Sequence, residues 1–292
     1  MKILVTGSNG FLGKSLLKIL SSNQSVTTYA LDLAHDDRLN NINYIEADIS
    51  NLDSISNHFK DIDVVVHYAS IADIHEASEN STKSITVNIL GTDNILKLCV
   101  KNNIRRIIFS SSIYVYSNQG GIYKITKRTC EDLIKFYSEK YNLNYSILKL
   151  GSLYGPYGNH FNFIYNSLVS AYKYKKISRP GIGDELREYI HVDDVNNYVV
   201  KIFDDLNEVS EDVILSGYQK HRVSEILEMI NEIMGGNIEI NYLKDEKFEG
   251  HYKFSPYNFE VKIPKKIILD SYVDLGNGII ECLNKIKNDE NL

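Results

Sequence analysis

The fold of this chain is decided by the stretch KILVTGSNGFLG, residues 2–13. A β-branched apolar run leads into Gly7, Gly10 and Gly13, and a helical pattern begins near Phe11. In such a loop the first glycine permits a tight turn, the second lets the backbone approach a pyrophosphate, and the third allows close helix–strand packing. The helix N-terminus then faces the anion. The stretch therefore predicts a dinucleotide site, whose expected cofactor-binding residues are Gly7, Asn9, Gly10, Phe11, Leu12 and Gly13.

Asp32 follows the next strand-like run, Val26 to Leu31, 19 residues after Gly13. A carboxylate at this place accepts hydrogen bonds from both hydroxyls of the adenosine ribose. Arg38 is close enough in sequence to hold a 2′-phosphate, but Asp32 would repel that group. We therefore expect NAD rather than NADP.

Short apolar runs alternate with amphipathic segments through the first 150 residues. The strand-like runs are Ile3 to Thr6, Val26 to Leu31, Val64 to His67, Ile107 to Phe109 and Tyr145 to Leu150, and the helical segments include Phe11 to Ser21, Ser84 to Val100 and Ile125 to Tyr141. This alternation predicts an α/β fold with a doubly wound parallel (Rossmann) sheet covered on both faces. The helix expected over Ser84 to Val100 would bury one stripe, made of Ile85, Ile89, Thr92, Leu96 and Val100.

The sequence pattern changes after Leu150, where Gly155-Pro156 and the segment from Arg179 to Gly183 interrupt the alternation of apolar runs and amphipathic segments. We expect residues 1–150 to form an NAD-binding domain. Residues 151–292 would form a smaller mixed α/β substrate domain, with room for the two to interleave along the chain. Its helical patterns are Asp193 to Leu206, Val223 to Met234 and Leu275 to Ile286.

Composition excludes several classes of protein. The 292 residues are 43% hydrophobic and carry a net charge of −6, so a nucleic acid partner is not expected. Cys99, Cys130 and Cys282 are widely spaced, which predicts neither a disulfide framework nor a zinc site and favours a reducing cytoplasm. No signal-peptide pattern is present and no apolar run approaches the roughly 18 residues of a membrane span. We expect an unprocessed protein of the cytoplasm without a membrane partner.

A second motif follows the run Ile107 to Phe109. Three serines end in Ser112, and Tyr123 and Lys127 then stand four residues apart at the start of a helical pattern. This spacing places both side chains on one helical face, where an ammonium favours the phenolate form of a tyrosine. Because a free phenol has a pKa of about 10, such neighbouring positive charge is what an acid or base needs near neutrality. Tyr123 is the candidate acid/base.

Taken together, these motifs resemble the extended short-chain dehydrogenase/reductases of the NAD-dependent epimerase/dehydratase family, which act on nucleotide sugars. The resemblance covers nearly the whole chain. Its carriers are Thr6 to Gly13, Asp32, Ala47 to Ile49, His67 to Ser70, Asn88 with Gly91-Thr92, the set Ser112, Tyr123 and Lys127, Leu153 to Pro156, and Arg187 to Asp194.

The resemblance implies a role for each matching residue near the cofactor. Asp48 and Ile49 would border the adenine, while Tyr68, Ala69 and Ser70 would line the pyrophosphate and the nicotinamide ribose. Asn88 is expected to be structural. His67 and His191 are read as packing or hydrogen-bonding histidines, and because no cysteines or carboxylates cluster with them, no metal site is expected.

The resemblance also implies the catalytic and substrate-binding residues. Ser112 would bond the hydroxyl or ketone on carbon 4 of the hexose, with Ser110 and Ser111 as rivals. Tyr123 would take or return the proton, and Lys127 would hold the nicotinamide ribose and lower the pKa of Tyr123. Arg187 would pair with the diphosphate of the nucleotide sugar, as a permanent forked cation suits. Ser152 stands where many members have a substrate-contacting Asn.

Two departures from the family narrow the chemistry. The 4,6-dehydratases carry Asp-Glu after the catalytic hydroxyl residue, where this chain has Ile113 and Tyr114. Dehydration and the related decarboxylation are therefore disfavoured, and chemistry confined to carbon 4 remains. Only ten residues separate Ser112 from Tyr123, fewer than is usual, which predicts a more open sugar pocket.

The leading hypothesis is a nucleotide-sugar 4-epimerase that keeps NAD bound and oxidises carbon 4 transiently. The alternatives are a 4-ketoreductase or 4-dehydrogenase of deoxysugar biosynthesis and, from another class, a non-catalytic NAD-sensing binding protein. The sugar and its nucleotide stay open. A homodimer is expected through the segments Ser84 to Val100 and Ile125 to Tyr141, whose apolar faces would form a four-helix bundle.

Overall fold

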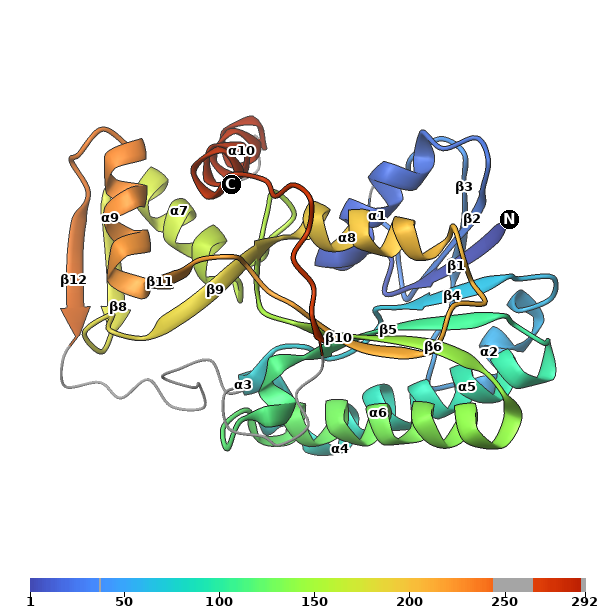
Figure 1. The fold of residues 1–292 in the computed structure, drawn as a ribbon. Helices are drawn as coiled ribbons and strands as arrows, with labels where there is room; N and C mark the ends of the chain where they lie inside the picture. Colours follow the sequence, from blue (N-terminus) through green and yellow to red (C-terminus); the bar gives the residue numbers. More distant parts are fainter. Residues whose placement is uncertain (37, 244–264, 290–292) are drawn as a thin grey trace.

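The computed structural model describes residues 1–36, 38–243 and 265–289 (Figure 1). Its centre is an eight-stranded sheet in the order β13-β10-β6-β5-β4-β1-β2-β3. Every neighbouring pair in this sheet is parallel. The strands are β1 (Lys2–Thr6), β2 (Thr27–Asp32), β3 (Ile42–Glu46), β4 (Val64–His67), β5 (Arg106–Ser112), β6 (Asn144–Leu150), β10 (Glu211–Leu215) and β13 (Lys265–Lys266). The strand order reverses between β1 and β4, so the predicted doubly wound sheet is confirmed.

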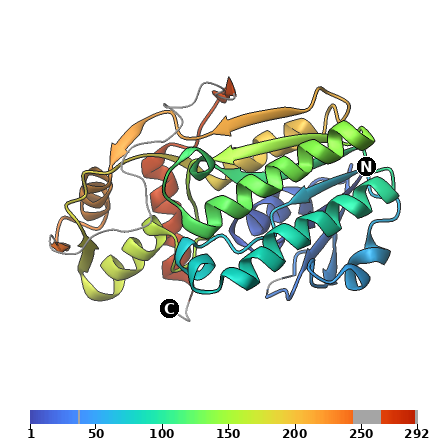
Figure 2. The ribbon, with the colours of Figure 1, turned by 90° about the horizontal axis from the view of Figure 1, so that it is seen from below.

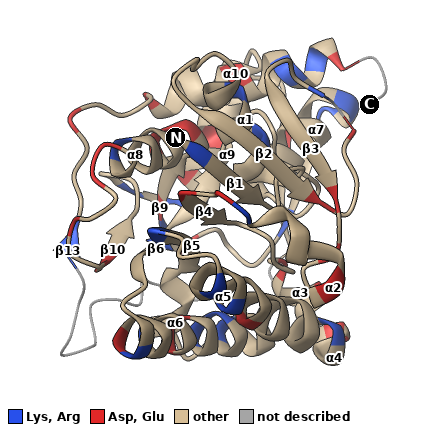
Figure 3. Cartoon of the chain, turned by 90° about the vertical axis from the view of Figure 1, so that its right-hand side faces the viewer, with Lys and Arg blue, Asp and Glu red and all other residues tan. Residues whose placement is uncertain are grey.

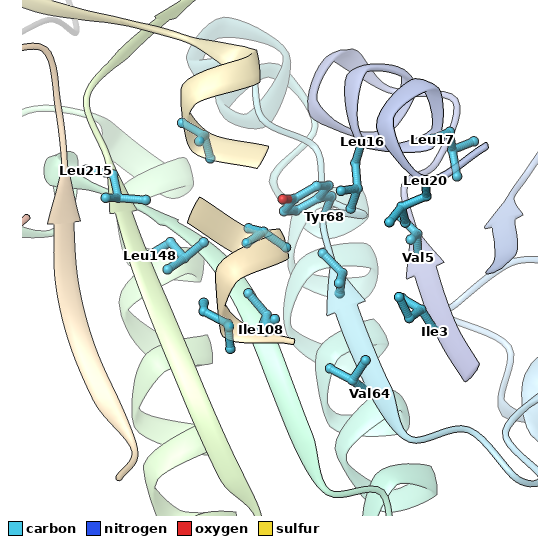
Figure 4. Close-up of a cluster of buried hydrophobic side chains, with 14 of the residues drawn as sticks. Ile3, Val5, Leu16, Leu17, Leu20, Val64, Tyr68, Ile108, Leu148 and Leu215 are labelled. Atoms are coloured by element: carbon cyan, nitrogen blue, oxygen red, sulfur yellow. The ribbon is translucent and has the colours of Figure 1, made fainter. Parts of the chain in front are cut away.

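Helices cover both faces of this sheet. Figure 3 shows α1 (Phe11–Ser21) and α8 (Val192–Ile202) on one side and α5 (Gly91–Lys101) and α6 (Gly121–Tyr141) on the other. One buried cluster joins α1 and α8 to the sheet, and Figure 4 shows how its aliphatic side chains surround Tyr68. A second cluster fills the space beneath α5 and α6. Because each helix buries one apolar stripe, both faces of the parallel strands stay out of water.

Among the residues that the structure describes, the smaller unit contains two short sheets and three helices. One sheet has the order β11-β9-β7 and the other pairs β12 with β8. Its elements are β7 (Ser152–Tyr154), α7 (Phe163–Tyr174), β8 (Lys176–Pro180), β9 (Leu186–His191), β11 (Lys220–Arg222), α9 (Val223–Ile233), β12 (Glu239–Leu243) and α10 (Leu275–Asn288). A third apolar cluster joins α7, α9 and α10. No helix among the described residues combines the length and apolar character of a membrane span.

The two units interleave along the chain. Strands β10 and β13 lie beyond residue 150 in sequence but extend the large sheet beside β6. The chain therefore enters the smaller unit at β7, returns to the large sheet at β10, enters the smaller unit again at β11, returns at β13 and ends in the smaller unit with α10 (Figure 1). The division at residue 150 stays a prediction.

The predicted helix over Ser84 to Val100 is divided in the structure. α4 (Ser81–Ser84) is followed by η2 (Ile85–Leu90), a π-helical stretch, and then by α5. A π turn contains an extra residue, which rotates the residues before it relative to those after it. Ile85 is 47% exposed, so its place in the predicted buried stripe is wrong, whereas Thr92 and Leu96 are buried as expected and Ile89 and Val100 are half-buried. The remaining short elements are α2 (Leu52–Ile55), η1 (Ser56–His58), α3 (Ile74–Glu79) and η3 (Ile113–Tyr116).

Candidate active site

The glycine loop between β1 and α1 packs too closely for any side chain. Gly7 has φ +69°, and a Cβ there would lie 2.4 Å from the Ala69 nitrogen. A Cβ on Gly13 would lie 2.2 Å from the Gly7 carbonyl oxygen. Gly10 is the N-cap of α1 and offers no side-chain cap, so the first backbone N–H groups of the helix are left for an anion. The loop fits a dinucleotide pyrophosphate, with Phe11 and Leu12 half-buried in the first turn.

Asp32 lies at the end of β2, beside this loop. Its carboxylate accepts hydrogen bonds from the Asn9 and Leu33 N–H groups at 2.8 and 2.7 Å. The Arg38 guanidinium is paired with Glu46 at 2.8 Å rather than with the loop. A 2′-phosphate would therefore meet the carboxylate of Asp32 and an arginine that is already engaged, which favours NAD.

The expected adenine-side residues are held by their own local contacts. Asp48 accepts hydrogen bonds from the N–H and the hydroxyl of Ser50, each at 2.8 Å. The Ile49 side chain packs against Gly91 of α5, where an added Cβ would lie 2.7 Å from its Cδ1. Ile49 is thus a core residue, and only its backbone and Asp48 are available to border a base.

The residues after β4 divide into a core side chain and a site side chain. The Tyr68 hydroxyl donates to the Asn196 amide oxygen at 2.8 Å inside the buried cluster of Figure 4, and burial raises its pKa. Only the Tyr68 backbone reaches the glycine loop. The Ala69 backbone also touches Gly7, whereas the Ser70 hydroxyl accepts a hydrogen bond from the Lys127 ammonium at 3.1 Å. The implied role of this segment is therefore divided between backbone and Ser70.

Lys127 is buried at the C-terminal end of β5. Its ammonium donates to the Ser110 carbonyl oxygen at 2.7 Å and lies 5.9 Å from the centre of the Tyr123 ring. Burial lowers the pKa of Lys127 to about 8, while the charges of Cys130 and Glu131 oppose that shift. The ammonium thus lies beside the phenol ring, as the spacing of four predicts.

Tyr123 and Ser112 meet at the same strand end. Burial raises the pKa of Tyr123 to about 12, and a hydrogen bond with the Ser112 side chain acts in the opposite direction. Ser110 and Ser111 point elsewhere, since the Ser110 hydroxyl donates to the His67 carbonyl oxygen and the Ser111 hydroxyl to Glu131. Among the three serines, Ser112 is the one beside Tyr123. The phenol is therefore protonated at neutral pH, and the expectation that Lys127 lowers the pKa of Tyr123 is not met, because burial outweighs the Ser112 hydrogen bond that acts against it.

Asn88 positions the helix that carries Lys127. Its side-chain amide accepts from the Ile71 N–H at 2.7 Å and donates to the Ile71 carbonyl oxygen at 3.1 Å and to the Thr126 hydroxyl at 3.0 Å. The amide therefore links the segment after β4 to α6 next to Lys127. His67 has a similar structural place: its ring nitrogens lie 2.7 Å from the Thr6 hydroxyl and 3.0 Å from the Thr92 hydroxyl, and burial lowers its pKa to about 3.

The expected substrate residues lie on the sheet of the smaller unit. Arg187 is buried on β9 and donates to the Leu186 carbonyl oxygen at 3.0 Å. Ser152 on β7 pairs with Tyr189, two residues beyond Arg187 on the neighbouring strand. Arg187 also lies near the buried Arg179, whose pKa is lowered chiefly by burial and further by the charge of Arg187. The Arg179 guanidinium is paired with Glu185 at 3.1 Å, so Arg187 is the candidate for a diphosphate.

A group of three possible metal ligands lies where β9 meets α8. His191, Asp193 and Glu281 bring one ligand atom each within 4.8 Å of one another. The His191 Nδ1 accepts the Asp193 N–H at 3.3 Å, and burial lowers the pKa of this ring, so its proton is on Nε2. That nitrogen lies 3.4 Å from a Glu281 carboxylate oxygen. The expectation that no carboxylates cluster with His191 is therefore wrong, because Asp193 and Glu281 both lie beside its ring.

Two groups of contacts were not foreseen from the sequence. His35 and Asp36 contact the glycine loop through Ser8 and Asn9. Glu131 and Lys149 form a buried ion pair at 3.0 Å close to Lys127. Glu131 stands four residues after Lys127, and Lys149 is a charge inside an apolar strand run, so the sequence did contain a signal: a buried charge needs a partner.

The chain is similar to known proteins over nearly its whole length. A family model described as NAD dependent epimerase/dehydratase family matches residues 3–215. A putative UDP-glucose 4-epimerase of Methanocaldococcus jannaschii is 28% identical over 98% of each chain. A UDP-glucuronate 4-epimerase of Thermodesulfobacterium geofontis is 25% identical over 97% of this chain and 98% of its own. The solved UDP-glucuronic acid 4-epimerase of Bacillus cereus, in complex with UDP-glucuronic acid and NAD, shares the fold with a TM-score of 0.83 at 22% identity, over 98% of this chain and 99% of that one.

Proposed function

Because this chain belongs to the NAD dependent epimerase/dehydratase family, we propose that it is a nucleotide-sugar 4-epimerase that keeps NAD bound. The family makes the chain an NAD-dependent enzyme of the extended short-chain dehydrogenase/reductase type. The two relatives compared over nearly their whole length carry the names of 4-epimerases, which supports a reaction at carbon 4. The identity of the sugar and of the nucleotide is left to experiment.

One observation carries the proposal. Ser112, Tyr123 and Lys127 converge at the end of β5, and the two residues after Ser112 are Ile113 and Tyr114. Ile113 is 1% exposed and lies in a small apolar cluster. No carboxylate follows Ser112, so the separate acid and base needed to eliminate water across carbons 5 and 6 are missing from that position. The groups at this strand end are suited to moving one proton at the oxygen on carbon 4.

Each residue of the candidate active site has a separate role in the proposed reaction. Ser112 donates a hydrogen bond to the oxygen on carbon 4 and holds it beside the phenol. Tyr123 takes the hydroxyl proton as carbon 4 is oxidised and gives it back as the ketone is reduced. Lys127 holds the nicotinamide ribose, and its positive charge stabilises the phenolate form of Tyr123. Arg187 binds the diphosphate, so the sugar ring can turn its other face while the nucleotide stays anchored.

NAD fits the glycine loop and Asp32, and when bound it accepts the hydride from carbon 4 and returns it. Gly7, Gly10 and Gly13 would admit the pyrophosphate, and Asp32 would accept the adenosine ribose hydroxyls. Burial holds the pKa of Tyr123 at about 12 in the cofactor-free protein. The positive charge of an oxidised nicotinamide would lower that pKa, which couples cofactor binding to the proton transfer.

The deciding experiment is incubation of the purified protein with UDP-, GDP-, CDP- and dTDP-hexoses without added cofactor. Products and the near-ultraviolet absorbance of NADH are followed together. A 4-epimer that appears without lasting NADH supports the proposal. Turnover that needs added NAD and accumulates NADH identifies a 4-dehydrogenase instead. If no hexose reacts, 4-keto sugars with NADH or NADPH test for a 4-ketoreductase, and inactivity there too favours a non-catalytic NAD-binding protein.

We also propose a homodimer. Five large apolar side chains are 44–52% exposed on η2 and α6, on the side of the sheet that Figure 2 shows facing the viewer. They are Ile85, Leu90, Ile125, Phe136 and Tyr141. Exposed apolar patches of this kind mark contact surfaces. Light scattering at micromolar protein should give twice the mass of one chain for the wild type and the mass of one chain for Ile125→Glu. A wild-type monomer would refute the proposal.

The free, buried cysteines Cys99, Cys130 and Cys282 support a cytoplasmic setting.

A further inference from the structure

A buried charged cluster lies between α6 and strands β5, β6 and β10. Its members are Ser111, Glu131, Lys135, Lys149 and Asp212, called here the α6 cluster. The Lys149 ammonium lies 3.0 Å from Glu131 and 2.8 Å from Asp212, and Lys135 lies 2.8 Å from Asp212. The Ser111 hydroxyl donates to the second oxygen of Glu131. The side chains of Lys149 and Glu131 are 2% and 7% exposed, so this pair is out of water.

Such a cluster is not explained by stability. Taking two charges out of water costs several kcal/mol per ion, and a buried ion pair is often no better than apolar side chains of the same volume. The charges do balance, since Lys135 and Lys149 meet Glu131 and Asp212. The place of the pair in the fold is therefore the informative feature.

Glu131 lies between two parts of the candidate active site. It follows Lys127 by one turn of α6, so the two side chains share a helical face. Through the hydroxyl of Ser111 it also holds the residue that directly precedes Ser112 on β5. Lys149 pairs with Ser111 in the β5–β6 register and fixes Glu131 from the neighbouring strand.

We propose that Glu131 is a positioning residue for the reaction, which holds Ser112 in place through Ser111 and keeps the Lys127 ammonium charged and oriented toward the cofactor ribose. This inference rests on the proposed function. Glu131 does not touch the reacting atoms: it acts through Ser111 on one side and through its charge on the other. Lys149 in turn keeps the Glu131 carboxylate ionised.

The electrostatics agree with this geometry. Lys127 is faced by Tyr123, Cys130 and Glu131 from α6 and by the neutral His67 from β4. Burial lowers the pKa of Lys127, and the interactions with Cys130 and then with the Glu131 carboxylate raise it. Burial raises the pKa of Glu131 itself, and this shift is opposed by Lys149 and by the Ser111 hydrogen bond, while Asp212 reinforces it. Loss of the Glu131 charge should therefore make Lys127 lose its proton at lower pH.

The test uses the full chain and four variants. Glu131→Gln removes the charge with little change of shape, and Glu131→Asp keeps the charge but shortens the side chain. Glu131→Gln leaves Lys135 and Lys149 sharing the one carboxylate of Asp212, and Glu131→Gln/Lys149→Met removes this excess positive charge, so that Lys135 and Asp212 balance. Lys135→Met is the matched control, because it lies one turn further along α6 and touches Asp212 rather than Glu131. Melting temperature, NAD affinity by titration calorimetry, and kcat and KM from pH 6 to 10 are measured for each.

The expected results separate positioning from folding. Glu131→Gln should lower kcat at least about tenfold with KM for the nucleotide sugar nearly unchanged, as misplaced catalytic groups do. The alkaline limb of the pH profile of kcat should move to a pH about one unit lower in Glu131→Gln, whereas it should stay in place in Glu131→Asp. The double variant should regain the melting temperature but neither kcat nor the position of the limb. Lys135→Met should match the wild type.

Recovery of kcat and pH profile together with the melting temperature in the double variant would overturn the proposal and leave the cluster a purely structural one. NAD affinity keeps this outcome distinct from a failure of the proposed function. If the wild type turns over no nucleotide sugar, weaker NAD binding by the correctly folded double variant at pH 8 still supports the role of Glu131. Unchanged NAD affinity in that case refutes it.

Discussion

The two ends of the candidate active site are built by different means. The glycine loop presents backbone: Gly7 and Gly13 leave no space for a side chain, and the uncapped start of α1 offers its N–H groups. The end of β5 presents buried side chains instead, with Lys127 held by Ser70 and by a backbone carbonyl. A site made of backbone admits almost no substitution, because every added atom collides. A site made of charged side chains responds gradually to substitution, because each neighbouring group shifts the pKa of the others.

The largest expected effect is at the side-chain end. Tyr123→Phe removes only the hydroxyl, so the fold should be kept, while the loss of the acid/base should lower kcat by about 10³-fold. Tyr114→Phe is the control, because its ring packs edge-on to Tyr123 at 6.2 Å without a place in the proton transfer. Steady-state kinetics with the substrate that the hexose incubation identifies measure both. Activity within tenfold of wild type for Tyr123→Phe would remove Tyr123 from the mechanism.

The glycine loop should fail more abruptly than its small change in volume suggests. Gly13→Ala places a methyl group 2.2 Å from the Gly7 carbonyl oxygen, so the loop must shift and NAD affinity should fall by about a hundredfold. Gly181→Ala is the control for an added methyl group, because no atom lies within 4 Å of it, although Gly181 has a positive φ, +78°, and Gly13 does not. That variant should lose only about 1 kcal/mol of stability. Equal NAD affinities in the two variants would contradict the comparison.

Asp32 tests whether side-chain charge matters at the backbone end as well. Asp32→Asn keeps the shape but removes the charge that opposes a 2′-phosphate, so NAD should bind about tenfold more weakly while NADP binds no worse. Calorimetric titration with both cofactors gives the ratio of the NAD affinity to the NADP affinity. Glu46→Gln releases Arg38 from its ion pair and should improve NADP binding further in the Asp32→Asn background. An unchanged ratio would place the adenosine ribose away from Asp32.

The smallest effect is a dependence of stability on pH at the side-chain end. Burial lowers the pKa of Lys127 to about 8, below the value of about 10.4 in an unfolded chain. Between these values the unfolded state binds more protons, so this group makes the protein more stable as the pH rises. From pH 8 to 9 the free energy of unfolding of the wild type should rise by about 1 kcal/mol relative to Lys127→Met. Urea titrations of both proteins at each pH measure this difference. If the free energies of unfolding of the two proteins change equally with pH, the pKa of Lys127 is not shifted.

The same contrast explains which parts could be predicted from the sequence. The glycine loop and the pair Tyr123 and Lys127 are local patterns, and the elements that carry them, β1, α1 and α6, were foreseen. The direction of a side chain in a connecting segment is not local. Tyr68 turns into the core because its hydroxyl reaches Asn196, 128 residues away. Nothing within the segment itself reveals such a partner.

Other features that could not be predicted from the sequence also depend on contacts between distant segments. Lys149 and Asp212 meet Glu131 only after β6 and β10 pair beneath α6, so the cluster depends on strand order. The π-helical turn at Ile85–Leu90 also follows from tertiary contact, since Asn88 within it bonds the segment after β4 and α6. A periodic apolar pattern predicts a regular helix and does not show where tertiary hydrogen bonds widen a turn.

The return of β10 and β13 to the large sheet constrains the order of events on the ribosome. When residues 1–150 have been synthesised, β6 is the edge of the sheet, and its unpaired N–H and C=O groups are open to association with other chains. The edge is covered by β10 only when residues 211–215 have emerged. The nascent chain must therefore wait for more than sixty further residues, which at about 5–20 residues per second is several seconds of exposure. A gene cut after residue 150 would make that exposure permanent, so the first half should aggregate when it is expressed alone.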